Sequence, residues 1–140
     1  MSGKSFVPQG QTAPASQIGA TIEALASTIA ARRGAGEESY TFRLLTGSPD
    51  AALKKVMEEA GEVALAAKDL EAAQATPAEA AALDHLRYEA ADVVYHLLVV
   101  LERYGIDIED LAAELNERMT EQERPAGAVR LASADINRGK

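Results

Sequence analysis

The chain has 140 residues, a formal net charge of −8 at pH 7, 47% apolar residues and no cysteine. Its length fits one domain, its charge disfavours nucleic acid and anionic membranes as partners, and the lack of cysteine excludes disulfides and thiolate metal sites. No apolar stretch approaches the roughly 20 residues of a membrane span, and residues 1–15 lack the apolar region of a signal peptide. We therefore expect a cytoplasmic protein, and its richness in Ala, Glu and Leu favours an all-α fold.

The predicted helices begin after a flexible arm, residues 1–15, in which Ser, Gly, Gln, Thr and Pro occur without periodicity. Apolar residues at helical spacing predict a first helix over residues 16–34. Residues 39–47 suit a helix of one or two turns. Ser48-Pro49-Asp50 then forms a strong start, with a capping hydroxyl and a proline at the first position, for a second helix to about Lys68.

Two more helices complete the predicted domain. Thr76-Pro77-Ala78-Glu79 fits a capping box, with proline at the first helical position, for a third helix that ends near Tyr104 before a glycine. A fourth helix then carries apolar residues as far as Met119. We expect an all-α domain of the four-helix-bundle type over residues 16–121 and a flexible C-terminal tail over residues 122–140.

The second predicted helix carries three carboxylates on one face. At about 100° per residue, Glu58, Glu59 and Glu62 lie within one arc, and their mutual repulsion favours a bound cation. Lys55 falls on the same arc, but one ammonium leaves excess negative charge. The core is instead expected along a separate apolar stripe: Leu53, Val56, Ala60, Val63 and Ala67.

The third predicted helix repeats this arrangement. Glu89, Asp92 and His96 fall within about 60° of one another. Its expected core stripe is a different set: Leu86, Ala90, Val93, Leu97 and Leu101. If the two helices pack antiparallel, their acidic faces meet and gather up to five carboxylates. Oxygen-only ligands favour Mg²⁺, with Mn²⁺ as the alternative, and such an ion can couple carboxylates to substrate phosphates.

Each of these features also has a plainer reading. Either acidic segment alone is usually a solvated face, and only their joint occurrence on two long helices favours a cation site. His96 alone is more often a packed or hydrogen-bonded histidine than a ligand, and we expect His85 at the surface. Lys54 and Lys55 suit salt bridges and phosphate contacts equally. A di-iron bundle is disfavoured because the sequence has no Glu-x-x-His motif.

The two acidic segments, with Ser39-Tyr40-Thr41 and Lys54-Lys55, resemble the phosphoribosyl-ATP pyrophosphatases of histidine biosynthesis, a family of the all-α nucleotide pyrophosphohydrolase superfamily. The acidic segments are typical of the superfamily, whereas Ser-Tyr-Thr and Lys-Lys indicate this family. The resemblance covers about residues 20–119 and includes Arg32-Arg33, Leu44-Leu45, Gly47, residues 54–63, 66–68 and 89–99, Gly105-Ile106 and Glu114-Leu115. Met57 and Gly61 stand where the family often has Gly and Thr.

The resemblance implies an enzyme that hydrolyses phosphoribosyl-ATP to phosphoribosyl-AMP and pyrophosphate, as a homodimer that completes the helical bundle. It implies four Mg²⁺ ligands: Glu59, Glu62, Glu89 and Asp92. The candidate catalytic carboxylates are Glu58, Glu59 and Glu62. The candidate substrate-binding residues are Ser39, Tyr40, Thr41, Lys54, Lys55 and His96. The number of metal ions and the identity of the general base stay open.

Two other functions stay open from the sequence. A house-cleaning pyrophosphohydrolase, which acts on aberrant nucleoside triphosphates, would share the metal site and differ in its base pocket. A non-catalytic helical dimerisation module would leave the acidic face solvated. A substrate panel separates the two enzymes, and the Glu62→Ala and Asp92→Ala variants separate an enzyme from the module. Measuring pyrophosphate release from phosphoribosyl-ATP with and without Mg²⁺ is the single most informative assay.

Overall fold

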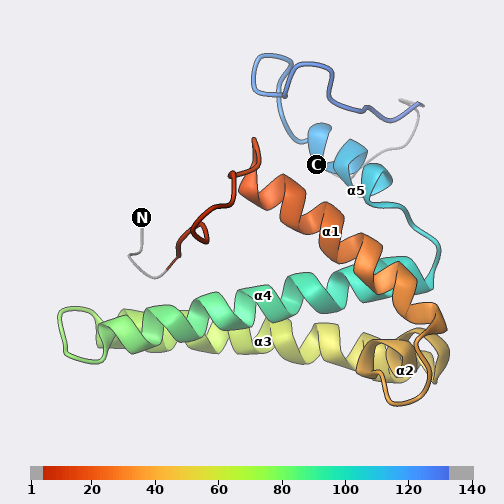
Figure 1. Cartoon of the computed structure of the whole chain (residues 1–140). Coiled ribbons are helices and arrows are strands. Elements are labelled where there is room, and N and C mark those ends of the chain that lie inside the picture. The colour runs from red at the N-terminus through yellow and green to blue at the C-terminus, as the bar shows by residue number, and fades with distance from the viewer. Residues whose placement is uncertain (1–4, 133–140) are drawn as a thin grey trace.

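The computed structural model describes residues 5–132, and over these residues the regular structure is entirely helical. The elements in chain order are α1 (Gln17–Ala31), the 3₁₀ turn η1 (Arg32–Gly34), α2 (Tyr40–Thr46), α3 (Pro49–Ala73), α4 (Glu79–Arg103) and α5 (Ile108–Asn116). α3 and α4 form one long antiparallel hairpin, α1 crosses the C-terminal half of α4, and α2 packs at the open end of the hairpin (Figure 1). The all-α prediction is confirmed.

Serine hydroxyls begin the first three α-helices. The Oγ atoms of Ser16, Ser39 and Ser48 accept hydrogen bonds from backbone N–H groups in the first turns of α1, α2 and α3, at 3.1, 3.2 and 3.3 Å. Each bond satisfies a backbone donor that the helix itself leaves free. α3 runs beyond its predicted end at Lys68, and a Lys68–Glu71 ion pair of 2.7 Å lies on the added turn.

The start of α4 differs from the predicted capping box. α4 begins at Glu79 with Ala78 at the N-cap position, so the expectation that Pro77 is the first helical residue is wrong. The hydroxyl of Thr76 accepts from the N–H of Ala78 at 3.2 Å, and the Glu79 carboxylate accepts from the N–H of Ala75 at 2.9 Å. Both side chains close the loop between α3 and α4, where Ala75 adopts a left-handed backbone with φ of 59°.

α5 ends at Asn116, so Met119 lies beyond this helix and not on it. The chain after α5 folds back on it, and Nδ2 of Asn116 donates to the carbonyl of Val129 at 2.9 Å. The predicted arm and tail are described only in part, because residues 1–4 and 133–140 lie outside the described residues. The predicted domain boundaries stay predictions.

The seam between α3 and α4 is not the apolar stripe that the sequence predicts. Its buried residues are Ala52, Glu59 and Ala66 on α3 with Glu89 and His96 on α4. Four residues of the predicted stripes are exposed instead: Leu53, Ala60, Ala90 and Leu97. Their prediction as core residues is wrong because periodicity shows which residues share a face and does not show which neighbour covers it. The two helices meet through their acidic sides.

This seam divides the hairpin into two opposite sides. A step of one residue along a helix rotates the side chain by about 100°. Because α3 and α4 are antiparallel, residues that follow a seam position turn to the same side of the hairpin, and residues that precede one turn to the other. Leu53 and Ala60 on α3 and Ala90 and Leu97 on α4 follow seam residues, and Met57, Ala64 and Val94 lie three or four residues from them on the same side. We call these seven exposed residues the apolar face. Glu58 precedes a seam residue and lies on the other side, together with Lys55 and Glu62, which are three and four residues from it, and with Asp92 on α4.

The large buried side chains gather at the open end of the hairpin. They form one cluster of six residues: Ile29, Leu44, Leu45, Ala52, Leu98 and Val99. The guanidinium of Arg103 donates to the carbonyls of Leu44 and Gly47 at 2.8 and 2.7 Å, which fastens the end of α2 to the end of α4. Among residues 5–132, the helices include none long and apolar enough to cross a membrane.

Candidate active site

Three carboxylates come together along the α3–α4 hairpin, in a group that we call the acidic cluster. Glu59, Glu89 and Asp92 each contribute one oxygen, and these oxygens lie within 4.8 Å of one another. Glu59 and Glu89 occupy seam positions and are 5% and 6% exposed, while Asp92 follows Glu89 by about one helical turn and is half-buried. The predicted meeting of two acidic helix faces is thus confirmed for these three residues.

One oxygen of the acidic cluster is buried without a hydrogen-bond partner among residues 5–132, namely Oε2 of Glu89. The other oxygen of Glu89 lies 3.4 Å from Nε2 of His85, a mostly exposed residue one turn earlier on α4. A buried carboxylate oxygen without a partner is costly, and three carboxylates whose oxygens lie this close together fit a hard divalent cation such as Mg²⁺ or Mn²⁺. The i,i+4 spacing of His85 and Glu89 is the sequence signal for this contact.

The electrostatics of Glu59 also favour the binding of a cation. Its pKa is raised from 4.5 to about 7, first by burial, then by a hydrogen bond with Glu62 and by the negative charges of Glu62 and Asp92. The ammonium of Lys55 opposes this rise, with Nζ 3.8 Å from Oε1 of Glu59. Glu62 itself is exposed and stands at the rim of the acidic cluster. A metal-free cluster therefore retains a proton near neutral pH, which a bound cation would displace.

We expect the metal-free protein to lose roughly 1 to 3 kcal/mol of stability between about pH 5 and pH 8. The pKa of Glu59 is about 7 in the folded chain and near 4.5 when unfolded, so within this window the folded chain binds more protons. Its free energy of unfolding therefore falls as the pH rises and levels off at about pH 8, once Glu59 has lost its proton in the folded chain. Urea unfolding followed by circular dichroism at about pH 5 and about pH 8 measures this change in the free energy of unfolding.

The matched control for this pH dependence is Glu59→Gln, which removes the titrating group and should flatten the profile. Addition of Mg²⁺ to the unsubstituted protein should restore stability most strongly at the higher pH, because the cation then replaces no proton. Equal stability of the unsubstituted, metal-free protein at the two pH values would contradict the burial of Glu59 beside two other carboxylates.

Glu58 turns toward two lysines and away from the acidic cluster. Its Oε1 lies 3.4 Å from Nζ of Lys54 and its Oε2 lies 3.3 Å from Nζ of Lys55. These contacts lower the pKa of Glu58, with the hydrogen bond to Lys55 as the largest cause. Glu58 precedes a seam position and so points about 100° away from Glu59. The structure therefore shows the lysines as salt-bridge partners whose ammonium groups stay accessible beside the cluster.

Residues at the start of α2 reach the side of α4 that carries Asp92. The hydroxyl of Tyr40 lies 3.0 Å from Nε2 of His96, and the hydroxyl of Thr41 is hydrogen-bonded to that of Tyr95. Sequence reasoning missed Tyr95, although its position directly before the seam residue His96 places it on this side. The segment that resembles the family's Ser-Tyr-Thr motif therefore borders the acidic cluster.

His96 is packed inside the protein. It is 6% exposed, and its Nδ1 lies 2.9 Å from the backbone carbonyl of Asp92 and 3.8 Å from Oε1 of Glu59. The ring of Tyr95 meets its ring edge-on at 4.9 Å between centroids. The plainer reading of His96 from the sequence, a packed and hydrogen-bonded histidine, is confirmed.

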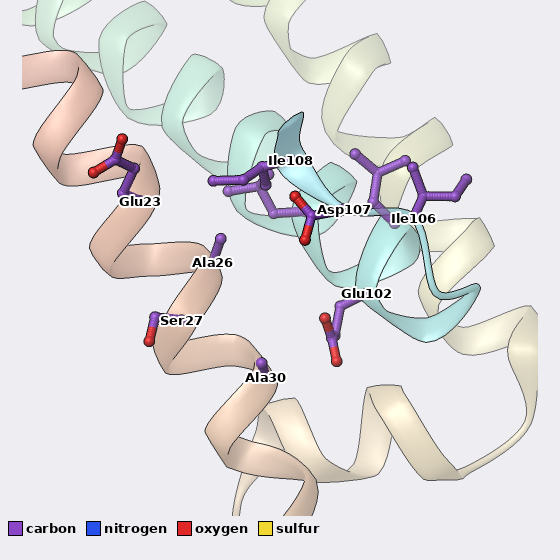
Figure 2. Close-up of a pocket in the computed structure, with 10 residues that line it drawn as sticks. Glu23, Ala26, Ser27, Ala30, Glu102, Ile106, Asp107 and Ile108 are labelled. Atoms are coloured by element: carbon purple, nitrogen blue, oxygen red, sulfur yellow. The ribbon is translucent and has the colours of Figure 1, made fainter. Parts of the chain in front are cut away.

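A pocket of about 260 Å³ opens elsewhere, between α1, the end of α4 and the turn before α5. Figure 2 shows Ala26 and Ala30 of α1 on one side and Glu102 and Ile108 on the other. The acidic cluster is not part of its lining within the described chain, and Glu102 is already paired with Arg33 at 2.8 Å. This pocket is therefore separate from the candidate active site.

Comparisons with known proteins agree on one family. A family profile described as phosphoribosyl-ATP pyrophosphohydrolase matches residues 22–119, a span that includes every candidate site residue. A phosphoribosyl-ATP pyrophosphatase of Paracidovorax citrulli is 40% identical over 110 residues, which are 76% of this chain and 75% of that protein. The corresponding protein of Dechloromonas aromatica is 39% identical over 98 residues, 69% of this chain and 81% of the relative. That of Halobacterium salinarum is 47% identical over 85 residues, 59% of this chain and 78% of the relative.

Proposed function

Because the chain belongs to the phosphoribosyl-ATP pyrophosphohydrolase family, we propose that it hydrolyses phosphoribosyl-ATP to phosphoribosyl-AMP and pyrophosphate with Mg²⁺, as a cytoplasmic step of histidine biosynthesis. The observation that carries the proposal is the buried Oε2 of Glu89, which has no partner in the described chain and belongs to a cluster of three carboxylates. A cation held there would help this acidic protein to bind a polyphosphate.

Glu59, Glu89 and Asp92, with Glu62 at the rim, are the proposed ligands of Mg²⁺, with Mn²⁺ as the alternative. When bound, the metal ion supplies positive charge that neutralises the triphosphate and polarises the α-phosphorus. The reaction breaks the anhydride bond between the α and β phosphates. A water molecule attacks the α-phosphorus, and pyrophosphate leaves. Glu58, Glu59 and Glu62 are the candidate groups that accept the proton of this water.

Lys54 and Lys55 are proposed to bind the phosphates of the substrate. Their ammonium groups lie beside the acidic cluster and at present contact Glu58. Because those side chains are 76% and 40% exposed, an incoming phosphate can replace Glu58 as their anionic partner without burying a new charge. Ser39, Tyr40 and Thr41 border the same side of the hairpin and complete the proposed substrate site, with the buried His96 behind Tyr40 as its hydrogen-bond partner.

A homodimer is also part of the proposal, and the apolar face of the hairpin supports it. Met57 is 77% exposed, Leu53 is 40% exposed and Val94 is 39% exposed, although all three belong to helices rich in apolar residues. Apolar side chains that line one side of a helical pair are covered when a second pair packs on them as a four-helix bundle. Asp92 of the acidic cluster and Glu62 at its rim lie on the opposite side, which a dimer of this kind would leave open to substrate.

The test is pyrophosphate release from phosphoribosyl-ATP by the full-length chain, with Mg²⁺ and with a chelator in excess. We expect one pyrophosphate for each phosphoribosyl-AMP, and a fall of at least about 100-fold when the metal is removed. A panel of aberrant nucleoside triphosphates serves as the specificity control. Equal rates on that panel would instead identify a house-cleaning pyrophosphohydrolase, and no release from any substrate would leave only a dimerisation module.

A further inference from the structure

Two neighbouring residues of α2 are fastened to two neighbouring residues of α4. We call these four residues the α2 clamp: Tyr40 and Thr41 on α2 with Tyr95 and His96 on α4. Tyr40 meets His96 at 3.0 Å, and the hydroxyls of Thr41 and Tyr95 meet each other. The partners are 56 and 54 residues apart in sequence, so these contacts fix the position of α2 against α4.

The contacts of His96 decide where its proton lies. The backbone carbonyl of Asp92 can only accept a hydrogen bond, so Nδ1, 2.9 Å away, carries the proton. In the neutral ring Nε2 is then the acceptor, and the hydroxyl of Tyr40 donates to it. Both nitrogens of this buried ring are therefore occupied by partners within the chain, and neither is left for a ligand.

The other polar groups of this region are occupied in the same way. The Oγ of Ser39 accepts from the N–H of Phe42 as the cap of α2, and the hydroxyl of Thr41 is bonded to Tyr95. The hydroxyl of Tyr40 is occupied by His96, yet 43% of the residue remains exposed. A substrate that reaches Tyr40 therefore finds the hydroxyl proton already donated to His96.

We infer that the α2 clamp is a positioning device, in which His96 holds the hydroxyl of Tyr40 and makes no hydrogen bond to the substrate. This inference rests on the proposed function and gives a role to four residues that border the site. The clamp acts on the acidic cluster directly, because His96 is bonded to the backbone of Asp92 and lies 3.8 Å from the Glu59 carboxylate. It thus holds α2 and the metal-binding turn of α4 in one fixed arrangement.

A double-mutant cycle distinguishes positioning from substrate contact. Tyr40→Phe removes the hydroxyl and keeps the ring, while His96→Asn retains an N–H for the Asp92 carbonyl and removes the acceptor for Tyr40. If the two residues act through one shared bond, each variant should lower kcat/KM about tenfold and the double variant also about tenfold. Two independent contacts with the substrate would instead multiply to about a hundredfold, which would overturn the inference.

A conservative variant and a matched control complete the kinetic test. The amide oxygen of His96→Gln can take the place of Nε2 as acceptor, so this variant should recover to within about threefold of the unsubstituted enzyme. Tyr104→Phe removes a tyrosine hydroxyl outside the clamp, at the exposed end of α4, and should leave kcat/KM unchanged. Failure of His96→Gln to recover, with its fold intact, would count against the shared bond.

Nitrogen-15 NMR of the histidine rings tests the clamp without any activity assay. The chain has only two histidines, so a His85→Gln variant leaves a single ring to observe. We expect His96 at about pH 8 to carry its proton on Nδ1, and the signal of Nε2 to shift in Tyr40→Phe. A proton on Nε2 would overturn the inference. An enzyme that is inactive yet shows the expected ring would overturn only the proposed function.

Discussion

Replacing Glu89 by Gln should lower Mg²⁺-dependent pyrophosphate release at least about 100-fold and abolish measurable Mg²⁺ binding. Glutamine has the same shape, but its amide places a donor where the buried Oε2 of Glu89 offers a free acceptor to a cation. Removal of one of three crowded charges also relieves repulsion within the acidic cluster. The metal-free variant should therefore be at least as stable as the unsubstituted protein, so loss of activity is not loss of fold.

Three measurements on the Glu89→Gln variant separate these effects: pyrophosphate release, calorimetric titration with Mg²⁺ or Mn²⁺, and urea unfolding without metal. The control is Glu71→Gln on the same hairpin, where an exposed glutamate is paired with Lys68 at 2.7 Å. This control should change neither activity nor metal affinity. If Glu89→Gln kept its activity within about threefold, the acidic cluster would not be the metal site.

Replacing Leu97 by Asp should convert the proposed dimer into a monomer. Leu97 lies on the apolar face and is 36% exposed in the single chain, so an aspartate there stays solvated until a second copy covers it. Burial of that charge at an apolar interface has a cost of several kcal/mol, which raises the dissociation constant at least about 100-fold. Sedimentation velocity over a range of concentrations measures the change.

The matched control for Leu97→Asp is Phe6→Asp, which places the same charge at an apolar residue that is 84% exposed and outside the hairpin. Phe6→Asp should leave the dimer intact. Both variants should retain the helical content of the unsubstituted chain by circular dichroism. An unsubstituted chain that sediments as a monomer at high concentration would refute the role of the apolar face, and so would a dimeric Leu97→Asp variant.

The helices and much of the acidic cluster could be predicted from the sequence, because both depend on residues that are only a few positions apart in the chain. Capping serines set where α1, α2 and α3 begin, and the three-residue step from Glu89 to Asp92 places both on one turn of α4. The same spacing predicts too many carboxylates in the cluster, because Glu58 is only one residue from Glu59 yet contacts Lys54 and Lys55. Side chains about 100° apart on one helix do not converge on a single cation.

The choice of buried face could not be predicted from one chain. Leu53 and Leu97 have the periodicity of core residues, and they are exposed because the hairpin closes through its acidic side. Apolar periodicity indicates which face of a helix is apolar. It does not show whether that face packs against the same chain or against a second copy. The α2 clamp was equally out of reach, because Tyr40 and His96 are 56 residues apart and no local pattern connects them.

The large aliphatic side chains are distributed unevenly along the hairpin, and this distribution would couple metal binding to the order of the half that is nearer the α3–α4 loop. The aliphatic cluster anchors only the open end, and between the acidic cluster and the loop the fully buried residue of α3 is Ala66. Alanine buries little apolar area, so an interaction that draws Glu59 and Glu89 together would add to the order of the turns near the loop. A bound ion near the middle of the hairpin would hold α3 and α4 together there, whereas without it the carboxylates of the acidic cluster repel one another. Metal supply would then govern the rigidity of this enzyme as well as its chemistry.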